Sequence, residues 1–429
     1  MALLQTLMGK GTVRMANGIT TDVVVIGSGI TATAIAFALS RRGVRNLLLL
    51  EQRTVNTGAT GRAFGLVHTY HAVREMTSLA RRSLRFYERF HQQTQRHGEL
   101  VRAGLLVLAP TGEQETLERR VQDANRRGNS LQLLHTGAAV QDIEPRLALT
   151  GIAASAYEEA ALFGNPVQVS AEFVNAARLE GTKLLEGIHI LRIDTEGNEG
   201  NRSIVGLLTD GGYVHTRYIV NAGGAWVNEL NTMIGVHMPI SPFRYVGLML
   251  RHPPTFGGPP LPIVFDLASG TVLRPNGPGQ TLMGPLVAAA ADLVVPGAEA
   301  PPPDRADEKE YMRFLQRRFP SLNTARMSGF WTATHDVTPD GLPMIGAVPD
   351  VGGYYCAVGM GGHSFCLAPA VGELVARLII DKRTNSSGLN VPPNFPGLDV
   401  RSHAHTFRPE RFRLTPPGQQ DHAVGAADG

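Results

Sequence analysis

The sequence predicts an α/β fold in which one domain is built on a parallel sheet and a second domain on an antiparallel sheet. A chain of 429 residues is too long for one ordinary core, so two domains are expected. Residues 22–27 and 46–51 are apolar runs on either side of a helical pattern, which is typical of strands buried on both faces of a parallel sheet. After residue 238, short strands alternate with Pro and Gly, which indicates an antiparallel sheet.

The elements follow in chain order. Gly27-Ser28-Gly29 turns the chain into a helix over 30–42, and Gly43 ends that helix before the strand at 46–51. The crossover of this βαβ unit should be right-handed. Apolar periodicity predicts further helices over 74–97, 166–181, 307–318 and 364–380. The other expected strands cover 184–193, 203–209, 213–220, 243–251, 262–267, 270–275, 280–284 and 353–358.

These patterns make the first domain discontinuous. We assign to it residues 21–75, 151–235 and 331–382, and to the second domain residues 76–150 and 236–330. Residues 1–20 and 393–429 are expected to be extensions, the second of them a wrapping or flexible tail rich in Pro, Arg and His.

Composition excludes several classes of protein. The formal net charge is only +3 and no basic block is interleaved with aromatic residues, so no nucleic-acid partner is expected. No apolar run reaches the roughly 18 residues that span a bilayer, and the N-terminal segment lacks the features of a signal peptide. The two cysteines, Cys356 and Cys366, fit a reduced, cytoplasmic setting. No Cys or His pair has zinc-ligand spacing with a matching second pair, so no metal is expected.

The turn at Gly27 carries a dinucleotide fingerprint. Gly27 permits the tight turn, Gly29 lets a pyrophosphate approach the backbone, and Ala32 permits close packing of helix on strand. The helix start then offers N–H groups and a partial positive charge to the phosphates. Glu51 ends the second strand, where a carboxylate accepts a ribose 2′-OH and disfavours a 2′-phosphate. A dinucleotide other than NADP is therefore expected.

Four motifs in one order resemble the glycine/D-amino-acid oxidase family of FAD-dependent oxidoreductases. Besides the fingerprint region with Thr57–Arg62 (TGATGR), they are Val220–Trp226 (VNAGGAW), Asp336–Gly346 (DVTPDGLPMIG) and Gly359–Ala370 (GMGGHSFCLAPA). The pattern is most similar to the sarcosine oxidase β-subunit-like branch. The resemblance implies a Rossmann-like FAD-binding domain of the glutathione-reductase type beside a substrate domain on the antiparallel sheet. It also implies that the helix start near His363 faces the flavin, where it would stabilise charge on the reduced ring.

Fingerprint and resemblance together predict the residues that contact FAD. They are Gly27, Gly29, Ile30, Thr31, Ala32, Glu51, Gln52, Arg53, Gly58, Ala59, Thr60, Arg62, Leu66, Ile190, Ala222, Gly223, Trp226, Gly359, Gly361, Gly362, His363, Ser364 and Phe365.

Departures from the family pattern narrow the chemistry. His335 stands where amino-acid oxidases of this family carry a carboxylate-binding Arg, and an imidazole cannot form that bidentate contact. Arg244 and Arg274 either hold an acid group or form domain-spanning ion pairs. Ala333 replaces the Cys that tethers FAD in monomeric sarcosine oxidases, and Arg62 replaces the His of dimethylglycine-dehydrogenase-like enzymes. Non-covalent FAD is therefore expected, and the lack of a motif Lys favours a dehydrogenase over an oxidase.

The resemblance implies oxidation of a C–N bond in an amino acid or secondary amine, with hydride transfer from the α-carbon to flavin N5. His335, His68 and Tyr245 are candidates for substrate contact or proton handling, although each could equally be a packed polar residue. One alternative is a flavin subunit that passes electrons to a partner in a larger dehydrogenase. Another is an FAD-stabilised binding protein without turnover. A homo-oligomer is compatible with either.

Overall fold

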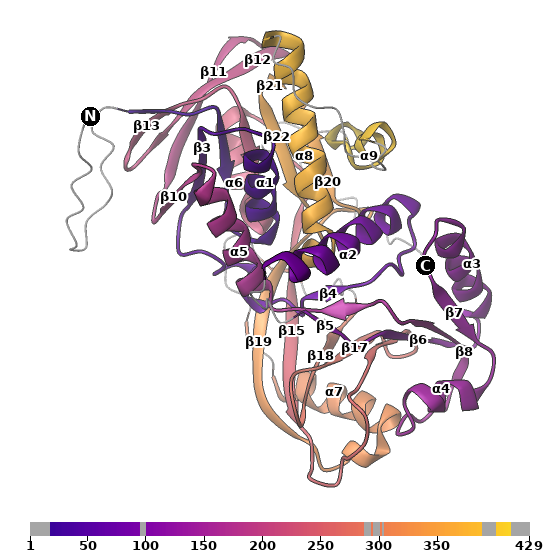
Figure 1. Cartoon of the computed structure of the whole chain (residues 1–429). Helices are drawn as coiled ribbons and strands as arrows, with labels where there is room; N and C mark the ends of the chain where they lie inside the picture. The colour runs from indigo at the N-terminus through magenta and orange to yellow at the C-terminus, as the bar shows by residue number, and fades with distance from the viewer. Residues whose placement is uncertain are drawn as a thin grey trace.

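The computed structural model describes residues 18–94, 100–286, 293–294, 301–302, 304–387 and 400–412. The predicted extensions therefore lie largely outside the described residues. Within these ranges the α/β class is confirmed, with a parallel sheet in one unit and a large, mainly antiparallel sheet in the other (Figure 1).

The first unit contains a six-stranded sheet in the order β10-β3-β2-β14-β22-β20. Neighbouring strands are parallel except at β20, which pairs antiparallel with β22. All residues of the central strands β2 and β22 are buried, because both faces of this sheet are covered. The strands are β2 (Val23–Ile26), β3 (Leu47–Glu51), β10 (Lys183–Glu186), β14 (Ile219–Asn221), β20 (Met344–Ala347) and β22 (Tyr354–Val358).

Alternate residues of β2 enter two different cores. Val23 and Val25 pack against the helices on one face, whereas Val24 and Ile26 pack beneath an antiparallel meander on the other. The helices are α1 (Ile30–Arg41), α2 (Arg74–Thr94), α5 (Pro166–Leu179) and α8 (Ser364–Ser387). The meander consists of β11 (Ile190–Asn198), β12 (Asn201–Thr209) and β13 (Gly212–His215), and it pairs with β1 (Ile19–Thr20) and β21 (Val351–Gly352).

The strand predicted over 213–220 is wrong as a single element. The chain leaves the meander after β13 and enters the parallel sheet at β14. Between them, the Thr216 hydroxyl donates to the carbonyl of Tyr218 at 3.2 Å and turns the chain. A short apolar run does not reveal this change of sheet.

The second unit is an eight-stranded sheet in the order β19-β15-β18-β17-β16-β6-β8-β7. Its pairs are antiparallel except for β16 with β6. In Figure 1 this sheet lies below the α/β unit. The strands are β6 (Leu105–Pro110), β7 (Leu131–Leu134), β8 (Ile152–Glu158), β15 (Ser241–Arg251), β16 (Ile263–Asp266), β17 (Thr271–Pro275), β18 (Gln280–Pro285) and β19 (Arg326–Val337). The helices are α3 (Gln114–Arg126), α4 (Gly137–Ile143) and α7 (Arg305–Arg318).

The two units are more interwoven than the sequence indicates. We expected β8 and the end of β19 in the first domain, but both pair within the large sheet. We expected α2 in the second domain, but its buried face belongs to the core around α1 and α8. Local periodicity predicts that one face of a helix or strand is buried, but it does not predict which element packs against that face. The domain boundaries otherwise stay a prediction.

A small sheet joins the units, formed by β4 (Leu66–Val67), β9 (Leu162–Phe163) and β5 (Val101–Arg102). Among the described residues, no helix combines the length and the apolar character that a bilayer crossing requires.

Candidate active site

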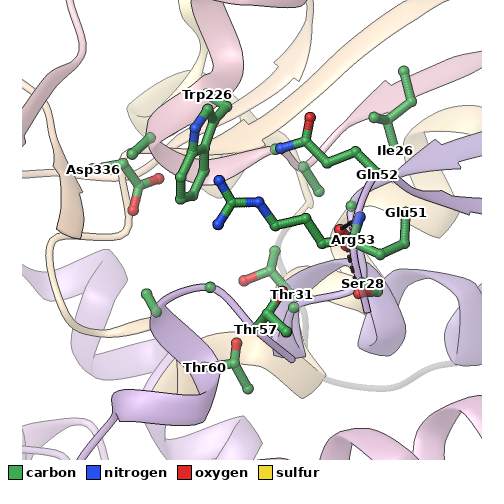
Figure 2. A pocket seen from close by; sticks show the side chains of 18 of the residues that line it. Ile26, Ser28, Thr31, Glu51, Gln52, Arg53, Thr57, Thr60, Trp226 and Asp336 are labelled. Atoms are coloured by element: carbon green, nitrogen blue, oxygen red, sulfur yellow. Dashed lines mark hydrogen bonds between the residues drawn. The ribbon is translucent and has the colours of Figure 1, made fainter. Parts of the chain in front are cut away.

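A cleft opens where β2, β3 and β14 end and α1 begins (Figure 2). Gly27 adopts φ +100°, and a Cβ at this position would lie 2.7 Å from the carbonyl oxygen of Ala222. Only glycine therefore fits the turn between β2 and α1. Gly29, at the N-cap of α1, leaves room for the Thr60 hydroxyl, which accepts the Ile30 N–H at 2.9 Å.

The start of α1 suits a phosphate group. Gly29 supplies no capping side chain, and the first turn contains no acidic residue. The positive end of the helix dipole therefore faces the cleft without a charge from its own turn to neutralise it.

Glu51 is fixed at the edge of this cleft. Its carboxylate accepts the Ser28 hydroxyl at 2.6 Å and the Arg53 N–H at 2.8 Å. Figure 2 shows the Arg53 side chain reaching toward Trp226, and its guanidinium carbon lies 5.8 Å from the indole ring. A carboxylate held in this way can accept ribose hydroxyls.

Most of the predicted cofactor contacts line this cleft. They are Gly27, Gly29, Ile30, Thr31, Glu51, Gln52, Arg53, Gly58, Ala59, Thr60, Ile190, Ala222, Gly223, Trp226 and Ser364. Ala32 lies instead in the core beneath α1. Arg62 donates to the carbonyls of Thr57 and Gly58, its own turn, and does not line the cleft.

A second cavity lies between the glycine-rich turn before α8 and the large sheet. Leu66, Gly361, Gly362, His363 and Phe365 line it, as expected for residues near a flavin. Asp336 stabilises this turn, a role that the sequence did not predict. Its carboxylate accepts the N–H of Gly359 at 2.6 Å and of Met360 at 3.4 Å. Gly359 itself, at φ +70°, shapes the turn without lining either cavity.

The three polar residues that the sequence predicted for substrate contact or proton handling also line the second cavity. His68 comes from the loop after β4, Tyr245 from β15 and His335 from β19. The rings of Tyr245 and His335 stack with centroids 4.6 Å apart. Burial lowers the pKa of His68 from 6.5 to about 3, and that of His335 and of His363 to about 4. All three imidazoles are therefore neutral at pH 7.

Of the two candidate arginines, Arg244 forms an ion pair, which is one of the two alternatives that the sequence left open. Its guanidinium forms an ion pair with Asp307 at 2.6 Å and donates to the carbonyls of Pro301 and Pro302. Arg244 lines neither cavity, and Asp307 belongs to α7 of the same unit, so this ion pair does not span the two domains as expected. A substrate contact by Arg244 stays a prediction. Residues of β15 alternate between the two faces of the sheet, which directs Arg244 away from the side that Tyr245 faces.

Arg274 lines a third cavity, and Ala63 lines both this cavity and the second one. The side chain is 7% exposed, and its guanidinium carbon lies 4.6 Å from the centre of the Phe163 ring. One nitrogen donates to the carbonyl of Pro275 at 2.7 Å, whereas Nε has no hydrogen-bond partner among the described residues. Burial lowers the pKa of Arg274 to about 10.

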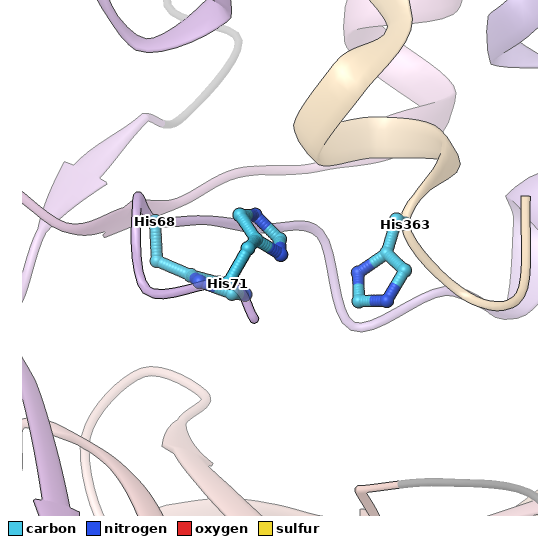
Figure 3. A group of neighbouring side chains, drawn as sticks. All are labelled: His68, His71 and His363. Atoms are coloured by element: carbon cyan, nitrogen blue, oxygen red, sulfur yellow. The ribbon is translucent and has the colours of Figure 1, made fainter. Parts of the chain in front are cut away.

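Sequence reasoning missed a cluster of histidines. His71 lies beside His68 and His363, with ring centroids 4.6 Å from the first and 5.2 Å from the second (Figure 3). The loop that carries His68 and His71 is held by Glu158, whose carboxylate accepts both the N–H and the hydroxyl of Thr69. His363 is distant in sequence, so only the fold reveals the cluster.

A cleft shaped for a dinucleotide next to a cavity whose described lining carries no charged side chain is typical of oxidoreductases that use a dinucleotide cofactor. The model of the DAO family, described as FAD dependent oxidoreductase, matches residues 22–378. The chain belongs to this family, and its cofactor is FAD. The glycines at 27 and 29, the uncapped start of α1 and the fixed carboxylate of Glu51 fit the pyrophosphate and ribose of that cofactor.

Several characterised relatives are similar over most of this chain. Glycine oxidase of Geobacillus kaustophilus is 27% identical, with 85% of this chain and 94% of that protein covered. The 4-methylaminobutanoate oxidase (formaldehyde-forming) of Paenarthrobacter nicotinovorans is also 27% identical, but the match covers 83% of this chain and only 43% of that protein. The solved structure of L-proline dehydrogenase from P. horikoshii superposes with a TM-score of 0.77 at 26% identity, with 85% of this chain and 94% of that one covered.

Proposed function

We propose that the chain oxidises a C–N bond in an amino acid or secondary amine and releases an imine. The observation that carries the proposal is the second cavity. None of the described residues that line it is Asp, Glu, Lys or Arg, and its polar groups are imidazoles, one phenol and one thiol. The relatives include proteins named glycine oxidase and L-proline dehydrogenase, which are enzymes that act on amino acids.

An uncharged cavity favours the reactive form of such a substrate. An ammonium group that enters it loses its hydration and meets no carboxylate, so the pKa of the amine falls and the neutral form is favoured. The free lone pair of the neutral amine assists departure of the α-hydrogen as hydride. FAD, held by the residues of the first cleft, would supply the acceptor for that hydride. Neutral His68 and His335 can accept a hydrogen bond from the amine N–H and orient it.

We propose Arg274 as the residue that binds the acid group of the substrate. A buried guanidinium whose Nε has no partner is unfavourable unless a ligand completes its hydrogen bonds. Among the described residues, no carboxylate forms an ion pair with it. A carboxylate in the third cavity could bind Arg274 while the amine extends past Ala63 into the second cavity.

The electron acceptor, the cellular location and the mode of FAD binding are also part of this proposal. Cys356 and Cys366 are free and buried, as in a reducing compartment, and we infer a cytoplasmic location and non-covalent FAD. None of the described residues that line the second cavity is a Lys that would assist oxygen reduction, so an acceptor other than oxygen is expected. A homo-oligomer or an electron-accepting partner is compatible with this proposal.

Anaerobic mixing with a panel of N-methyl, D-, L- and cyclic amino acids tests the proposed chemistry. At least one amine should bleach the flavin absorbance, and the bleaching rate should rise with pH as the free amine is deprotonated. Reoxidation by oxygen should be slow compared with reoxidation by an artificial acceptor. Bleaching by 2-hydroxy acids alone would show that the C–N assignment is wrong.

A further inference from the structure

We propose that a cavity between α2 and α3 binds the phosphate group of a small anion, either a phosphomonoester or free phosphate. This fourth cavity has a volume of about 400 Å³, which is within the range of small-molecule sites. It shares no lining residue with the cofactor cleft or with the second and third cavities. Its lining consists of His71, Ala72, Arg74, Thr77, Glu113, Thr116, Arg119, Arg120, Asp123, Ala124 and Arg127.

Both units of the molecule contribute to this cavity. The residues from α3 recur at intervals of three or four positions, for example Thr116, Arg120 and Asp123, which places them on one face of the helix. The rest of the lining comes from residues 71–77, at the start of α2 and in the loop before it. Since α3 packs on the large sheet and α2 belongs to the core of the α/β unit, the cavity lies where the two units meet.

The lining carries an excess of positive charge. It contains four arginines but only two carboxylates, Glu113 and Asp123. Asp123 already pairs at 3.0 Å with Arg126, which is not part of the lining. Among the described residues, none of the four arginines forms an ion pair with a carboxylate. Like charges around one cavity repel each other, so a bound anion would stabilise this arrangement.

Two of the guanidinium groups are held in place by the fold. Nη1 of Arg120 donates to the Tyr70 hydroxyl at 3.3 Å, and the guanidinium carbon lies 5.8 Å from the centre of the Tyr70 ring. Nη1 of Arg127 donates to the carbonyl of Asp123 at 3.1 Å, whereas its Nε has no hydrogen-bond partner among the described residues. A guanidinium that is already ordered loses less entropy on binding, and its other N–H groups match the geometry of phosphate oxygens.

The charge of the cavity favours a doubly charged ligand. The arginines and carboxylates of the lining give a net charge of +2. A phosphomonoester carries about −1.5 to −2 at pH 7, whereas a simple carboxylate is only singly charged. The hydroxyl of Thr116 adds a donor for a phosphate oxygen. These features together favour a phosphate group over a carboxylate.

The fourth cavity lies next to the substrate cavity without opening into it. His71 lines the fourth cavity, and its ring centroid lies 4.6 Å from that of His68 and 5.2 Å from that of His363. The latter two residues line the second cavity. A ligand beside His71 would therefore be separated from the second cavity by these rings, and its binding does not depend on amine chemistry.

Isothermal titration calorimetry of the FAD-saturated enzyme, in a phosphate-free buffer of low ionic strength, tests the site. Ribose 5-phosphate and inorganic phosphate are the probes, and ribose is the uncharged control. At least one phosphate should bind with one equivalent, and the tighter of the two identifies the source of the phosphate group. Added salt should weaken the binding, because it screens the attraction between the charges.

The variants Arg120→Gln and Arg127→Gln should each raise the dissociation constant of the tighter phosphate about 10–100-fold, since each removes a charged hydrogen-bond donor. Arg74 is exposed at the start of α2, so Arg74→Gln should leave the fold intact and raise the dissociation constant less, about two- to fivefold.

Arg85→Gln serves as the matched control, because Arg85 is exposed on α2 and is not part of the lining. It should bind the tighter phosphate as the unmodified enzyme does. The flavin spectrum and far-UV circular dichroism should confirm that each variant is folded and retains FAD. The proposal fails if neither phosphate binds, or if the folded Arg120, Arg127 and Arg74 variants all bind phosphate as tightly as the control. Neither result would bear on amine oxidation, which is measured separately by flavin bleaching.

Discussion

At the level of single residues, two arginines of the large sheet differ in what surrounds them. Arg244 has Asp307 as its counter-ion, whereas Arg274 is more deeply buried and lies against Phe163. The sequence made both equal candidates for an acid-binding group. Burial and ion pairing distinguish the two arginines, and neither property can be predicted from one residue and its sequence neighbours.

Replacement of Arg274 by Gln should weaken the binding of acidic substrates. Loss of a charged hydrogen bond to a carboxylate costs about 1.5–3 kcal/mol, which corresponds to a rise of about 10–100-fold in KM. The limiting rate of flavin bleaching should change much less, because Arg274 lies outside the cavity of His335.

Arg244→Gln is the control for charge and size on the same sheet, and its KM should equal that of the unmodified enzyme. Stopped-flow bleaching over a range of substrate concentrations separates KM from the limiting rate. Equal KM values for the two variants would remove Arg274 from the substrate site.

Residues that a motif fixed lie together in the structure, although their contacts with FAD stay a prediction. Gly27, Glu51 and Thr60 were expected at the cofactor and line the first cleft. His68, Tyr245 and His335 share one cavity as well, but their catalytic roles stay predictions. Glu158 was missed and Asp336, although part of a motif, was given no role, because a buried carboxylate that binds main-chain N–H groups leaves no periodic signal in the sequence.

At the level of elements, α1 and α8 pack closely where they cross in the α/β unit. A Cβ on Gly372 would lie 2.5 Å from the carbonyl oxygen of Ala34. Backbone atoms cannot move aside as a flexible side chain can, so the helices would have to separate. Since α1 begins at the first cleft and α8 at the second cavity, their separation would disturb both ends of the cofactor site.

Gly372→Ala should therefore destabilise the protein, by about 1–3 kcal/mol as in other overpacked cores. Chemical denaturation of the FAD-saturated protein, followed by far-UV circular dichroism, measures the loss. Gly257→Ala is the control, because a Cβ at Gly257 meets nothing within 4 Å. Equal denaturation midpoints for the two variants would contradict the crossing.

At the scale of the whole molecule, the fold class was predictable and the connections between units were not. Buried apolar runs identified β2 and β3, and Pro- and Gly-separated strands identified the large sheet. The sequence did not reveal that β6 and β8, close in the chain, extend the same sheet as β16. Pairing between distant strands depends on tertiary packing, which local patterns do not encode.

The histidines that converge between the two units make the stability of the molecule depend on pH. In the folded protein, the pKa of His335 and of His363 is about 4 and that of His68 about 3, against 6.5 as the ordinary value. Between about pH 6.5 and 4 the unfolded chain therefore binds more protons than the folded one, so stability falls as the pH falls through this window. Glu158, with a pKa of about 6, and Asp336, whose pKa burial also raises, act in the opposite sense. These two carboxyls are outnumbered by four imidazoles, because burial lowers the pKa of His71 as well.

The midpoint of thermal unfolding at saturating FAD should therefore fall as the pH is lowered from 7 to 5. His335→Asn should make this fall shallower by up to one proton, or about 1.4 kcal/mol per pH unit. The exposed His135→Asn variant should keep the full slope. An unchanged slope in His335→Asn would mean that this ring is not held neutral in the folded protein, and the uncharged character of the substrate cavity would then have to be abandoned.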